Sequence, residues 1–455
     1  SPDSGEFFID SKLVNIKNPE DAISLGIGMV HQHFMLVPTF TVAENLVLGR
    51  EQVGKLGKLD LAAAREKVRA ISSKYKLAVD PDSKVEDLPV GVQQRVEIIK
   101  ALALDVKVLI FDEPTAVLTP SEIIEFFSIV RTLIDAGKGV VFITHKLKEA
   151  LTIASRINVL RRGKVVGDAD PKNSSEAKIA EMMVGRPVQL TVNKTAAKPD
   201  KVVLAVKDLS VIDPEGRLLV ENVSFNVRAG EIVGIAGVQG NGQTELVEAL
   251  SGLRRISQGS VSLDSNDITQ ASPRTRHTLG MGHVPEDRQR QGLITGMTIT
   301  ENLVLTRYHD AEFCNGFKMK WSSAKKRAAE LVQSYDIRTS DPDQLASTLS
   351  GGNQQKVIVA RELSRDIRLA LASQPTRGID VGSIEYIHTQ MVKERDSGTA
   401  VLVVSTELDE VMSLSDRVLV MYRGKIVADL DPKKVSHMDV GLYMAGSRPA
   451  EAVAS

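Results

Sequence analysis

Leu349-Ser-Gly-Gly-Asn-Gln-Gln-Lys356 opens a helix-like run that continues through Val357–Arg365. Ser350 is a residue type that begins helices, and the free amides and the dipole at a helix N-terminus favour an anion. Gly351 and Gly352 have no Cβ, so their backbone can approach a phosphate closely. The stretch therefore predicts a phosphate-binding helix start, although an ordinary glycine-rich helix cap would have the same composition.

The chain contains this pattern twice. Three segments of its first half recur, in the same order, in its second half at offsets of 257 to 261 residues. The matched pairs are Val42–Leu48 with Ile299–Leu305, Leu88–Gln94 with Leu349–Gln355, and Arg162–Val166 with Arg423–Val427. Chance matches would not keep nearly one offset, and the period is far too long for a solenoid, so the repeat indicates a duplicated domain.

A polar stretch without apolar periodicity, residues 191–201, separates the halves and is expected to be a surface linker. We therefore expect a first domain over 1–190, a second over 202–447 and a tail over 448–455. Apolar runs that read as strands alternate with helical segments in the second half, which favours an α/β fold with a largely parallel sheet. The expected strands are 202–211, 220–227, 231–236, 400–405 and 417–421, and a helical subdomain is expected over 308–365.

The composition is that of a soluble globular protein with sizeable cores, since 42% of the 455 residues are apolar and 25% are charged. Lys and Arg number 57 against 58 Asp and Glu, so no overall basic field points to a nucleic-acid partner. The single cysteine, Cys314, excludes a disulfide framework and a cysteine-based zinc site. No apolar run approaches the ~18–20 residues that span a bilayer, and no signal peptide is evident, which indicates a cytosolic chain.

The first half carries residues suited to nucleotide hydrolysis. The short apolar strand 108–111 ends in Asp112-Glu113, where a carboxylate can hold Mg²⁺ beside phosphates and Glu113 can polarise an attacking water. His145 ends the next strand and could reach a γ-phosphate, and Gln32, at the end of an earlier strand, could join the Mg²⁺ and water shell. Each residue alone has an ordinary explanation, since a strand-end Asp-Glu is usually only solvated and a lone His is usually packed or exposed.

The corresponding positions of the second half have lost this chemistry. Leu88 precedes Asp112 by 24 residues, and Leu349 precedes Ser373 by the same number, which aligns the two strand ends. A glycine loop, Gly237–Thr244 (GVQGNGQT), follows a buried strand, in place of the phosphate loop GxxxxGK[ST]. The replacements are Gln243 for the loop lysine, Ser373-Gln374 for Asp112-Glu113, Glu407 for His145 and Glu286 for Gln32. Glycines and backbone donors remain to cradle a phosphate; the alternative is that this loop binds no nucleotide.

The first half shows no glycine loop of its own. Projecting Gly237 back by 254 to 261 residues gives positions before Ser1, where an initiator methionine would be expected. We therefore expect the first domain to be truncated at its N-terminus, either as a fragment of a longer gene product or as a truncated reading frame.

Together these motifs resemble those of ATP-binding-cassette (ABC) ATPases. Leu349–Lys356 is similar to the signature motif of that family, Asp112-Glu113 to its Walker B site, His145 to its switch histidine and Gln32 to its Q-loop. The resemblance implies two tandem ABC-type P-loop NTPase domains, each with a mixed or parallel sheet core and a helical subdomain. It also implies ATP and Mg²⁺ as cofactors, with Asp112 and Gln32 serving the metal through the nucleotide.

ABC cassettes are understood to pair head to tail, so that each nucleotide lies between one cassette's phosphate loop and the other's signature. On this resemblance the catalytic residues of the first half share a site with the second signature, and Asp380 looks like the D-loop residue that reaches it. The other site combines the altered loop with the first signature, where Pro89 replaces the serine. The implied nucleotide-binding residues are Ser350, Gly351, Gly352, Gln354, Asp380, Gly237, Gly240, Asn241, Gly242, Gln243 and Thr244. One site is expected to hydrolyse ATP and the other is not.

This asymmetry narrows the resemblance to the ATPase subunits of bacterial importers for simple sugars and nucleosides, and Gly28–Phe40 looks closest to the nucleoside branch. The implied partners are integral membrane permease subunits and a separate solute-binding protein, with no nucleic acid, and the cassettes pair within the chain or in a homodimer. The chain would lie on the cytoplasmic face of the cell membrane, with Phe34–Phe40 helping to form the groove for a permease helix. Two alternatives stay open: a non-catalytic remnant, and a soluble twin-cassette protein acting on ribosomes.

Overall fold

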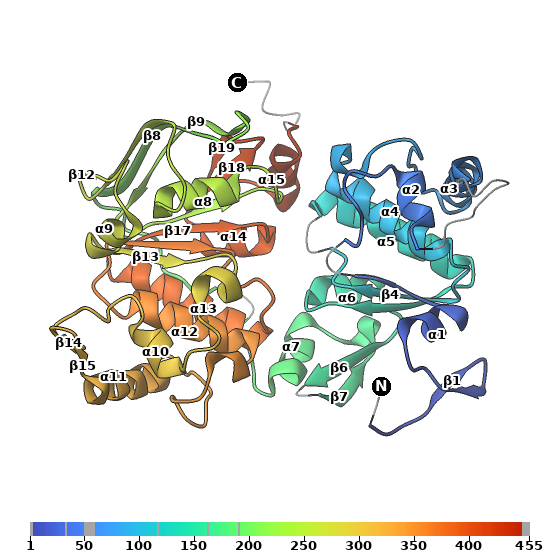
Figure 1. Ribbon diagram of the computed structural model, residues 1–455, viewed down its shortest axis with the longest axis horizontal. Coiled ribbons are helices and arrows are strands. Elements are labelled where there is room, and N and C mark those ends of the chain that lie inside the picture. Colours follow the sequence, from blue (N-terminus) through green and yellow to red (C-terminus); the bar gives the residue numbers. More distant parts are fainter. Residues whose placement is uncertain are drawn as a thin grey trace. The chain divides into compact units, whose positions relative to one another are not determined.

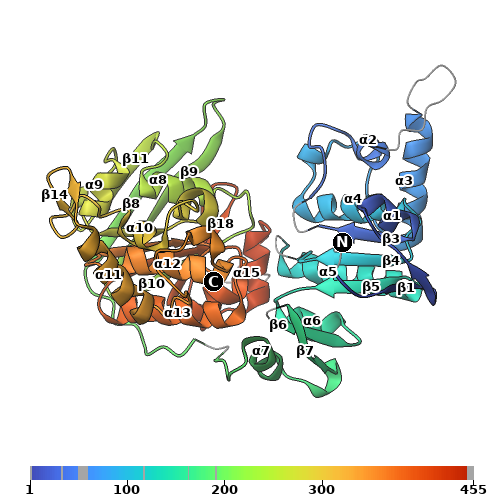
Figure 2. The ribbon, with the colours of Figure 1, turned by 60° about the horizontal axis from the view of Figure 1, so that its bottom comes forward.

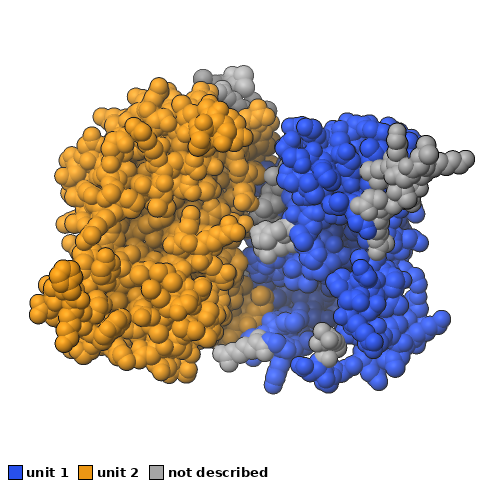
Figure 3. All heavy atoms as spheres, viewed as in Figure 1, with its two compact units in different colours: residues 1–179 blue, residues 180–455 orange. Residues whose placement is uncertain are grey.

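The computed structural model of the chain describes residues 3–31, 34–49, 60–115, 118–161, 163–189 and 192–447. By its internal contacts the chain divides into two compact units, unit 1 (Ser1–Ile179) and unit 2 (Ala180–Ser455), which Figure 3 colours separately. The division falls inside a helix, α7 (Glu176–Val184), ahead of the polar stretch 191–201.

Unit 2 has more helices and strands than unit 1, and it serves as the reference for the repeat. In chain order these are β8 (Val202–Ile212), β9 (Leu218–Arg228), β10 (Ile232–Ala236), α8 (Gln243–Ser251), β11 (Gln258–Leu263), β12 (Asn266–Asp267), α9 (Pro273–Thr278), β13 (Met281–Val284), the π-turn η3 (Arg288–Gly292), α10 (Ile299–Val304), β14 (Cys314–Asn315), β15 (Lys318–Met319), α11 (Trp321–Ser334), the 3₁₀ turn η4 (Ala346–Thr348), α12 (Gly351–Leu363), β16 (Leu369–Ser373), α13 (Val381–Asp396), β17 (Ala400–Ser405), α14 (Leu408–Leu414), β18 (Arg417–Tyr422), β19 (Lys425–Leu430) and α15 (His437–Met444). The strands expected from the sequence of the second half are all present.

The main sheet of unit 2 has the strand order β13-β16-β17-β10-β18-β19, and its neighbours run parallel except for β18 and β19. Strands β16 and β17 are buried along their whole length. Continuous apolar runs of this kind are typical of parallel strands that are covered on both faces. The expected α/β fold with a largely parallel sheet is therefore confirmed.

Alternate residues of these strands pack against different layers. Leu371 and Val404 join a buried cluster that includes α8 and the antiparallel sheet β12-β11-β8-β9, whereas Ala372 and Val403 join a cluster that includes α12 and α13. Figure 1 shows α8 on one side of β17 and helices α12 and α13 on the other. Because helices cover both faces, the carboxyl ends of the parallel strands are left as the edge where functional side chains gather.

The expected helical subdomain over 308–365 is only partly helical. Helices α11 and α12 lie in this range, but the hairpin β14–β15 precedes them, with Gly316 at a φ of +60° in its turn. Phe313, which is 1% exposed, anchors the start of the hairpin in a small cluster of its own. Asn315 pairs with Lys318, so Gly316 takes the first position of a two-residue turn, where glycine is favoured, and charge-based reasoning overlooked this signal.

Unit 1 repeats the plan of unit 2 with fewer elements. These are β1 (Phe7–Ile9), β2 (Lys12–Val14), α1 (Pro19–Ser24), β3 (Ile27–Val30), α2 (Val42–Val47), α3 (Leu61–Tyr75), the 3₁₀ turn η1 (Val85–Asp87), α4 (Val90–Leu102), β4 (Val108–Asp112), α5 (Pro120–Asp135), β5 (Gly139–Ile143), α6 (Leu147–Ile153), β6 (Ile157–Arg161), β7 (Lys164–Ala169), the 3₁₀ turn η2 (Pro171–Asn173) and the first part of α7. Figure 2 shows β3, β4 and β5 beside the helices that cover them.

The sheets of the two units correspond strand by strand. The parallel sheet β3-β4-β5 has the order of β13-β16-β17, and the antiparallel pair β6-β7 has that of β18-β19. Among the described residues of unit 1, however, no strand matches β10 and no helix matches α8. Val141 and Ile143 of β5 are therefore 48% and 46% exposed, although their counterparts in β17, Leu402 and Val404, are buried by that layer.

The expected linker over 191–201 has no regular structure in its described part, residues 192–201, but this part belongs to unit 2, with contacts at Val192, at Lys194 and at residues 200–201. Lys194 Nζ donates to the carbonyls of Leu414 (2.8 Å) and Ser415 (2.6 Å) at the end of α14 and lies 3.3 Å from Asp416. Burial lowers the pKa of Lys194, against the opposing effect of Asp416. A lysine at the carbonyl end of a helix is a favourable partner for its free acceptors, so the polar composition reflects an anchored strap rather than a free tether. Residues 448–455, the expected tail, lie outside the described residues.

Candidate functional site

The carboxyl ends of β4 and β5 bring two of the expected catalytic side chains together. Glu113 follows β4 with a φ of +45°, and its N–H donates to the carbonyl of Ile143 (3.0 Å), which fixes the turn at the strand end. A positive φ is uncommon for residues other than glycine, and residues in this strained backbone conformation are concentrated at functional sites. His145 Nδ1 lies 2.8 Å from Glu113 Oε1, and both side chains are about three-quarters buried.

The hydrogen bond from His145 lowers the pKa of Glu113, although burial alone would raise it. The carboxylate is therefore ionised near neutral pH, where it can accept a proton or orient a water molecule. Asp112 ends β4 one residue earlier and is half-buried. Its oxygen is a donor type that Mg²⁺ prefers. Gln32, the other residue expected in this shell, lies outside the described residues.

A buried pair behind this strand end was missed by the sequence reasoning. Thr115 Oγ1 donates to the carboxylate of Glu149, at 2.7 and 2.6 Å from its two oxygens, and both residues are buried. In unit 2, Thr376 donates in the same way to Glu410 (2.8 Å). Both pairs are separated by 34 residues in the chain, so the recurrence of a Pro-Thr dipeptide and a glutamate at this distance was a signal that could have been used.

Unit 2 keeps the backbone geometry of this site but not its chemistry. Gln374 follows β16 with a φ of +47°, and its N–H donates to the carbonyl of Val404 (2.7 Å), as in unit 1. Its side-chain Oε1 accepts from the N–H (3.1 Å) and the hydroxyl (3.2 Å) of Thr406. A neutral amide and a hydroxyl thus stand where unit 1 has a carboxylate and an imidazole.

The assignment of Glu407 to the position of His145 was wrong by one residue. Strand pairing places Ile143 opposite Asp112 and Val404 opposite Ser373, so His145 corresponds to Thr406. Glu407 instead begins α14, just as Lys146 begins α6. The error arose because Ile143-Thr-His145 and Ser405-Thr-Glu407 share a threonine that sequence comparison aligns, while the register of the strands does not.

The backbone of the glycine loop Gly237–Thr244 has a conformation that requires glycine at two positions. Gly240 and Gly242 have φ values of +87° and +96°, and a Cβ on Gly242 would lie 2.6 Å from the carbonyl of Leu219. Gly242 also begins α8, so the loop ends at the N-terminus of a nine-residue helix. Asn241 Oδ1 accepts from the N–H of Arg423 (3.0 Å) and closes the loop from the side. The loop therefore has the shape of a phosphate cradle.

The side chains around this loop are less suited to a nucleotide. Gln243 is 5% exposed, and its Nε2 donates to the carbonyl of Ile235 (3.4 Å), so it faces inward and carries no positive charge. Glu286 Oε2 accepts from the hydroxyl of Thr244 (3.0 Å), and Glu286 Oε1 pairs with Arg377 (2.7 Å). A carboxylate beside the loop repels a bare phosphate, whereas Thr244 and Glu286 together offer two oxygen donors of the kind that Mg²⁺ prefers.

The signature segment begins α12 as expected, but the hydroxyl of Ser350 does not cap the helix. Ser350 occupies the N-cap position, yet its Oγ accepts from the side chain of Asn353 (3.0 Å) and bonds no backbone amide of the helix. Pro89 occupies the same position at the start of α4, also without a side-chain cap. The hydroxyl of Ser350 thus does not hold the helix start together.

Packing inside unit 2 explains the two glycines of the signature. A Cβ on Gly351 would lie 2.8 Å from the guanidinium of Arg288, and one on Gly352 would collide with the side chains of Ser383 and Asp380. Asp380 caps α13 by accepting from the N–H (3.0 Å) and the hydroxyl (2.8 Å) of Ser383. Gly351, Gly352 and Asp380 are thereby brought together. Within this unit, the close approach that requires glycine is made by the side chains of Arg288, Ser383 and Asp380. The expected approach of these glycines to a phosphate stays a prediction.

Gln354 lies inside this helix start rather than at its surface. The side chain is 3% exposed, and its Nε2 donates to the carbonyl of Ala346 in η4 (3.2 Å). It ties η4 to α12 and so supports the position of Ser350. The residue was expected to bind nucleotide, and its inward orientation indicates a supporting role instead.

Comparison with known proteins identifies the family. A family model described as "ABC transporter" matches residues 1–116 and 220–377, more than half of the chain. The chain belongs to the ABC transporter family. ATP-binding proteins of ABC transporters are transport ATPases, so the chain is an ATP-binding transport ATPase subunit with two ABC cassettes in tandem. None of its described helices is both long and apolar enough to cross a membrane.

Relatives within the ABC transporter family match almost the whole chain. The nucleoside import ATP-binding protein NupA of Lactococcus lactis subsp. cremoris (strain MG1363) is 47% identical over 98% of this chain and 88% of the relative. The guanosine import ATP-binding protein NupO of Bacillus subtilis (strain 168) is 45% identical over 99% of this chain and 88% of the relative. The glucose import ATP-binding protein TsgD13 of Haloferax volcanii is 41% identical over 100% of this chain and 88% of the relative.

Proposed function

We propose that the chain is the ATP-hydrolysing subunit of a nucleoside importer, with one catalytic nucleotide site and one degenerate site. The observation that carries the proposal is the contrast between two equivalent strand ends. Glu113 is an ionised carboxylate hydrogen-bonded to His145, whereas Gln374 is a neutral amide hydrogen-bonded to Thr406. A carboxylate can take up the proton of an attacking water, and an amide cannot.

In the catalytic site, Glu113 orients the attacking water and accepts its proton. His145 holds the carboxylate in place through Nδ1 and keeps its pKa low, so that the charge is present before ATP binds. Asp112, one residue earlier, would hold Mg²⁺ together with the phosphates, and the ion would offset their negative charge. We further propose that Ser350, Gly351, Gly352 and Asp380 complete this site from the second cassette.

In the degenerate site, the loop Gly237–Thr244 binds nucleotide without hydrolysing it. The preformed backbone cradle supports binding, while Gln243 and Gln374 remove the cation and the base that turnover needs. Through Mg²⁺, Thr244 and Glu286 would supply oxygen ligands in place of the missing lysine.

The two cassettes are proposed to occupy residues 1–190 and 202–447, fused in one polypeptide. We also propose that the Walker A loop of the first cassette is not among these 455 residues. The exposed face of β5 at Val141 and Ile143 supports this, because in unit 2 the corresponding face is covered by the helix that follows the loop.

Nucleosides are proposed as the cargo ahead of simple sugars, because the two relatives at 47% and 45% identity are named for nucleoside and guanosine import, and the relative named for glucose import is at 41%. An importer of this kind needs integral membrane permease subunits and a separate solute-binding protein. The chain would act at the cytoplasmic face of the cell membrane, bound to the permease rather than inserted in the bilayer.

Steady-state ATP hydrolysis tests the site assignment. We would measure it for the polypeptide translated from the complete gene, joined to its permease in nanodiscs, and in parallel for the 455-residue chain. We expect turnover in the first case, its loss with Glu113→Gln, and no turnover by the 455-residue chain. Turnover by the 455-residue chain alone would overturn the one-active-site assignment, and no turnover by either protein would favour a non-catalytic remnant.

Uptake by proteoliposomes that also contain the solute-binding protein tests the cargo. Radiolabelled guanosine is expected to be accumulated in an ATP-dependent manner, and excess unlabelled adenosine or uridine is expected to compete. Excess ribose or glucose is expected not to compete. Uptake of a sugar with no response to nucleosides would overturn the choice of cargo while leaving the ATPase assignment intact.

A further inference from the structure

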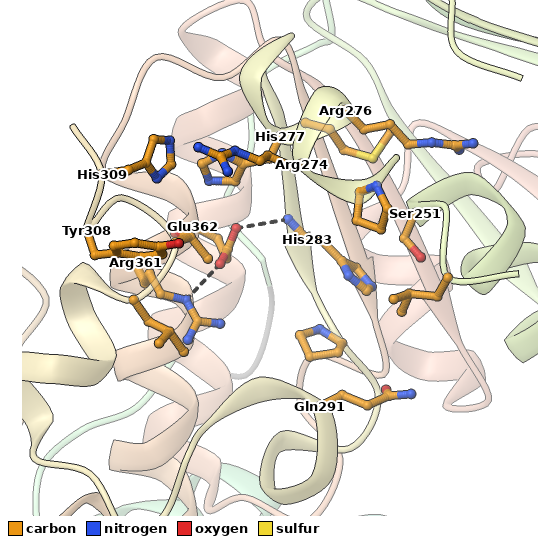
Figure 4. A pocket seen from close by; sticks show the side chains of 16 residues that line it. Ser251, Arg274, Arg276, His277, His283, Gln291, Tyr308, His309, Arg361 and Glu362 are labelled. Atoms are coloured by element: carbon orange, nitrogen blue, oxygen red, sulfur yellow. Dashed lines mark hydrogen bonds and ion pairs between the residues drawn. The ribbon is translucent and has the colours of Figure 1, made fainter. Parts of the chain in front are cut away.

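The hairpin β14–β15 lies at the periphery of unit 2, next to α11, as Figure 1 and Figure 2 show. The chain reaches it from α10 through Tyr308 and His309, which Figure 4 shows beside a pocket of ≈ 340 Å³. It leaves the hairpin directly into α11, which begins at Trp321. Strand pairing ends at Asn315 and Lys318, so the two residues between them, Gly316 and Phe317, form the tip of the hairpin.

Phe317 stands fully in water at this tip. Its exposed fraction is 110%, the highest among the large apolar side chains that the structure describes. A single exposed apolar residue is ordinary on a protein surface, but residues on either side of the hairpin are also aromatic and exposed, Tyr308 at 53% and Trp321 at 46%. Tyrosine and tryptophan are enriched where a membrane meets water, because each joins an apolar ring to one polar group. This composition is typical of a contact with lipid.

The hairpin and the start of α11 are basic. Residues 314–327 include five basic side chains and no acidic one, although the whole chain has a net charge of −1. Three of the five are exposed and form no ion pair within the described residues: Lys318, Lys320 and Lys326. The acidic side chains just before the hairpin, Asp310 and Glu312, both pair with Arg307 (2.7 and 2.9 Å), which offsets part of their charge. Lysines beside an apolar tip complement a surface of negative charge.

The base of the hairpin is fixed to the body of unit 2. Phe313 is 1% exposed, and the guanidinium of Arg307 lies 5.2 Å from the centre of its ring. Lys320 closes the other strand, since its N–H donates to the carbonyl of Phe313 (2.8 Å) and its Nζ to that of Ala311 (2.8 Å). The tip is therefore presented on an ordered support, which lowers the entropy lost when it makes a contact.

We propose that the tip of hairpin β14–β15 enters the headgroup region of an anionic phospholipid bilayer. Phe317 inserts among the lipids, and Lys318 and Lys326 contact lipid phosphates. This inference rests on the proposed function, which brings the chain to the cytoplasmic face of the membrane, and deepens it by naming a lipid contact. One aromatic side chain and a few lysines are less than the two strong signals that stable anchoring needs. The contact therefore adds to other interactions at the membrane and does not hold the chain there alone.

A bilayer fits this tip better than a protein surface does. Stable protein interfaces bury about 800 Å² on each partner around a core from which lysine is depleted. The tip instead presents one protruding ring, Phe317, with lysines beside it, and a bilayer admits such a side chain singly. The equivalent connection in the first half, residues 48–60, contains no aromatic residue in its sequence. We therefore expect the lipid contact from the second cassette alone.

A vesicle titration of the 455-residue chain at low salt tests the contact, with Trp321 as the reporter. Trp321 is the single tryptophan of the chain and follows Phe317 by four residues, so its emission reports on this hairpin rather than on apolar surface elsewhere. Equimolar phosphatidylcholine and phosphatidylglycerol are expected to shift the emission to shorter wavelength, and the same lipids with brominated acyl chains to quench it. Partitioning into phosphatidylcholine alone should be at least about fivefold weaker, because the attraction of the lysines is lost.

Matched variants locate the contact. Phe317→Ser should weaken partitioning into the mixed vesicles at least about tenfold, since the inserting side chain is lost. Lys318→Gln should weaken it about fivefold in the mixed vesicles and leave phosphatidylcholine unchanged. Phe8→Ser makes the same change at an exposed phenylalanine (61%) of the hairpin β1–β2 and should alter the response of Trp321 less than about twofold. All three side chains are exposed, so the variants are expected to fold, and denaturant unfolding checks this.

The outcomes separate the inference from the proposed function. If the mixed vesicles leave the emission of Trp321 unchanged, or if Phe317→Ser partitions as well as the wild-type chain, the lipid contact is wrong and the transport function stands. If vesicles have no effect but Phe317→Ser weakens binding to the solubilised permease, the tip contacts protein and the inference is overturned. If the vesicle results are as expected but the complete polypeptide does not hydrolyse ATP, the lipid contact stands and the proposed function fails.

Discussion

The strand ends after β4 and β16 have the same backbone and different chemistry. Glu113 and Gln374 share a left-handed φ and the same N–H to carbonyl bond to the neighbouring strand. The side chain of Glu113 contacts His145, and the side chain of Gln374 contacts Thr406. In each unit the contacted residue lies two positions after the residue whose carbonyl accepts that N–H. The comparison teaches that the turn is a property of the fold, because its backbone is the same in both units, and that the two turns differ in their side chains alone.

The largest effect should come from exchanging these side chains. Glu113→Gln is expected to reduce ATP turnover by the complete polypeptide at least about 100-fold, because the base that accepts the proton of water is lost. Gln374→Glu, the reverse change at the equivalent position, should alter turnover less than about threefold. Steady-state phosphate release measures both. A comparable loss from the two variants would remove the asymmetry between the sites.

Ser350→Ala sharpens the comparison of the two signatures. Since the hydroxyl of Ser350 accepts from Asn353 and does not cap α12, its removal should cost less than about 0.5 kcal/mol of unfolding free energy. If the hydroxyl of Ser350 binds the nucleotide held by the other cassette, the Ser350→Ala variant should still lose about tenfold or more of the ATP turnover. Pro89→Ser, at the equivalent position of the first signature, should leave turnover unchanged. Denaturant unfolding and ATPase rates of the two variants separate a helix cap from a ligand contact.

We expect the stability of unit 2 to fall at acidic pH because of His283. Burial lowers the pKa of His283 to about 4, whereas the matching residue in β3 is Met29. An unfolded histidine takes up a proton near pH 6.5 and the folded one does not, so stability is complete above pH 6.5 and falls as the pH drops toward 4.

The expected contribution of His283 to this loss between pH 7.5 and pH 5 is about 2 kcal/mol. His283→Gln should remove most of it. The single tryptophan, Trp321, lies in unit 2, so its fluorescence during denaturant unfolding reports the relevant unit. An unchanged pH dependence in the variant would show that another group is responsible.

The smallest effect is expected from the amide contact of the degenerate site. Gln374→Ala removes the acceptor for the N–H and the hydroxyl of Thr406 and should cost about 1–2 kcal/mol of unfolding free energy, with turnover unchanged. Thr406→Val, which removes only the hydroxyl, should cost less. A fall in turnover with either variant would mean that the second site takes part in the chemistry.

Much of the fold could be predicted because it rests on local pattern. Apolar runs such as Leu369–Ser373 and Ala400–Ser405 are typical of strands covered on both faces, and the repeat supplies their partners in unit 1. The position of Thr406 could not be predicted, because it depends on the register between β16 and β17, and a shared threonine favours the wrong alignment.

The candidate site was predicted where single residues carry the chemistry and missed where the contacts are tertiary. Glu113 and His145 end neighbouring strands, so their proximity follows from topology. The pairing of Thr115 with Glu149 joins residues 34 positions apart, and the inward turn of Gln354 depends on η4, which no local pattern predicts. The signature glycines were recognised, but their packing against Arg288 and Ser383 required the folded unit.

The anchored strap sets where this gene could be divided. Lys194, inside the polar stretch, caps α14, and Arg186, ahead of the stretch, pairs with Glu385 of α13 (2.8 Å). Both residues therefore belong to the second compact unit, although the repeat in the sequence extends the first cassette to residue 190. If the chain were expressed as two polypeptides divided after Lys194, α14 would lose the lysine that caps it. If it were divided within 191–193, Arg186 would stay on the first polypeptide and its ion pair with Glu385 would no longer lie within one chain. The workable cut lies ahead of Arg186, which makes the second half, strap included, the transferable module of this protein.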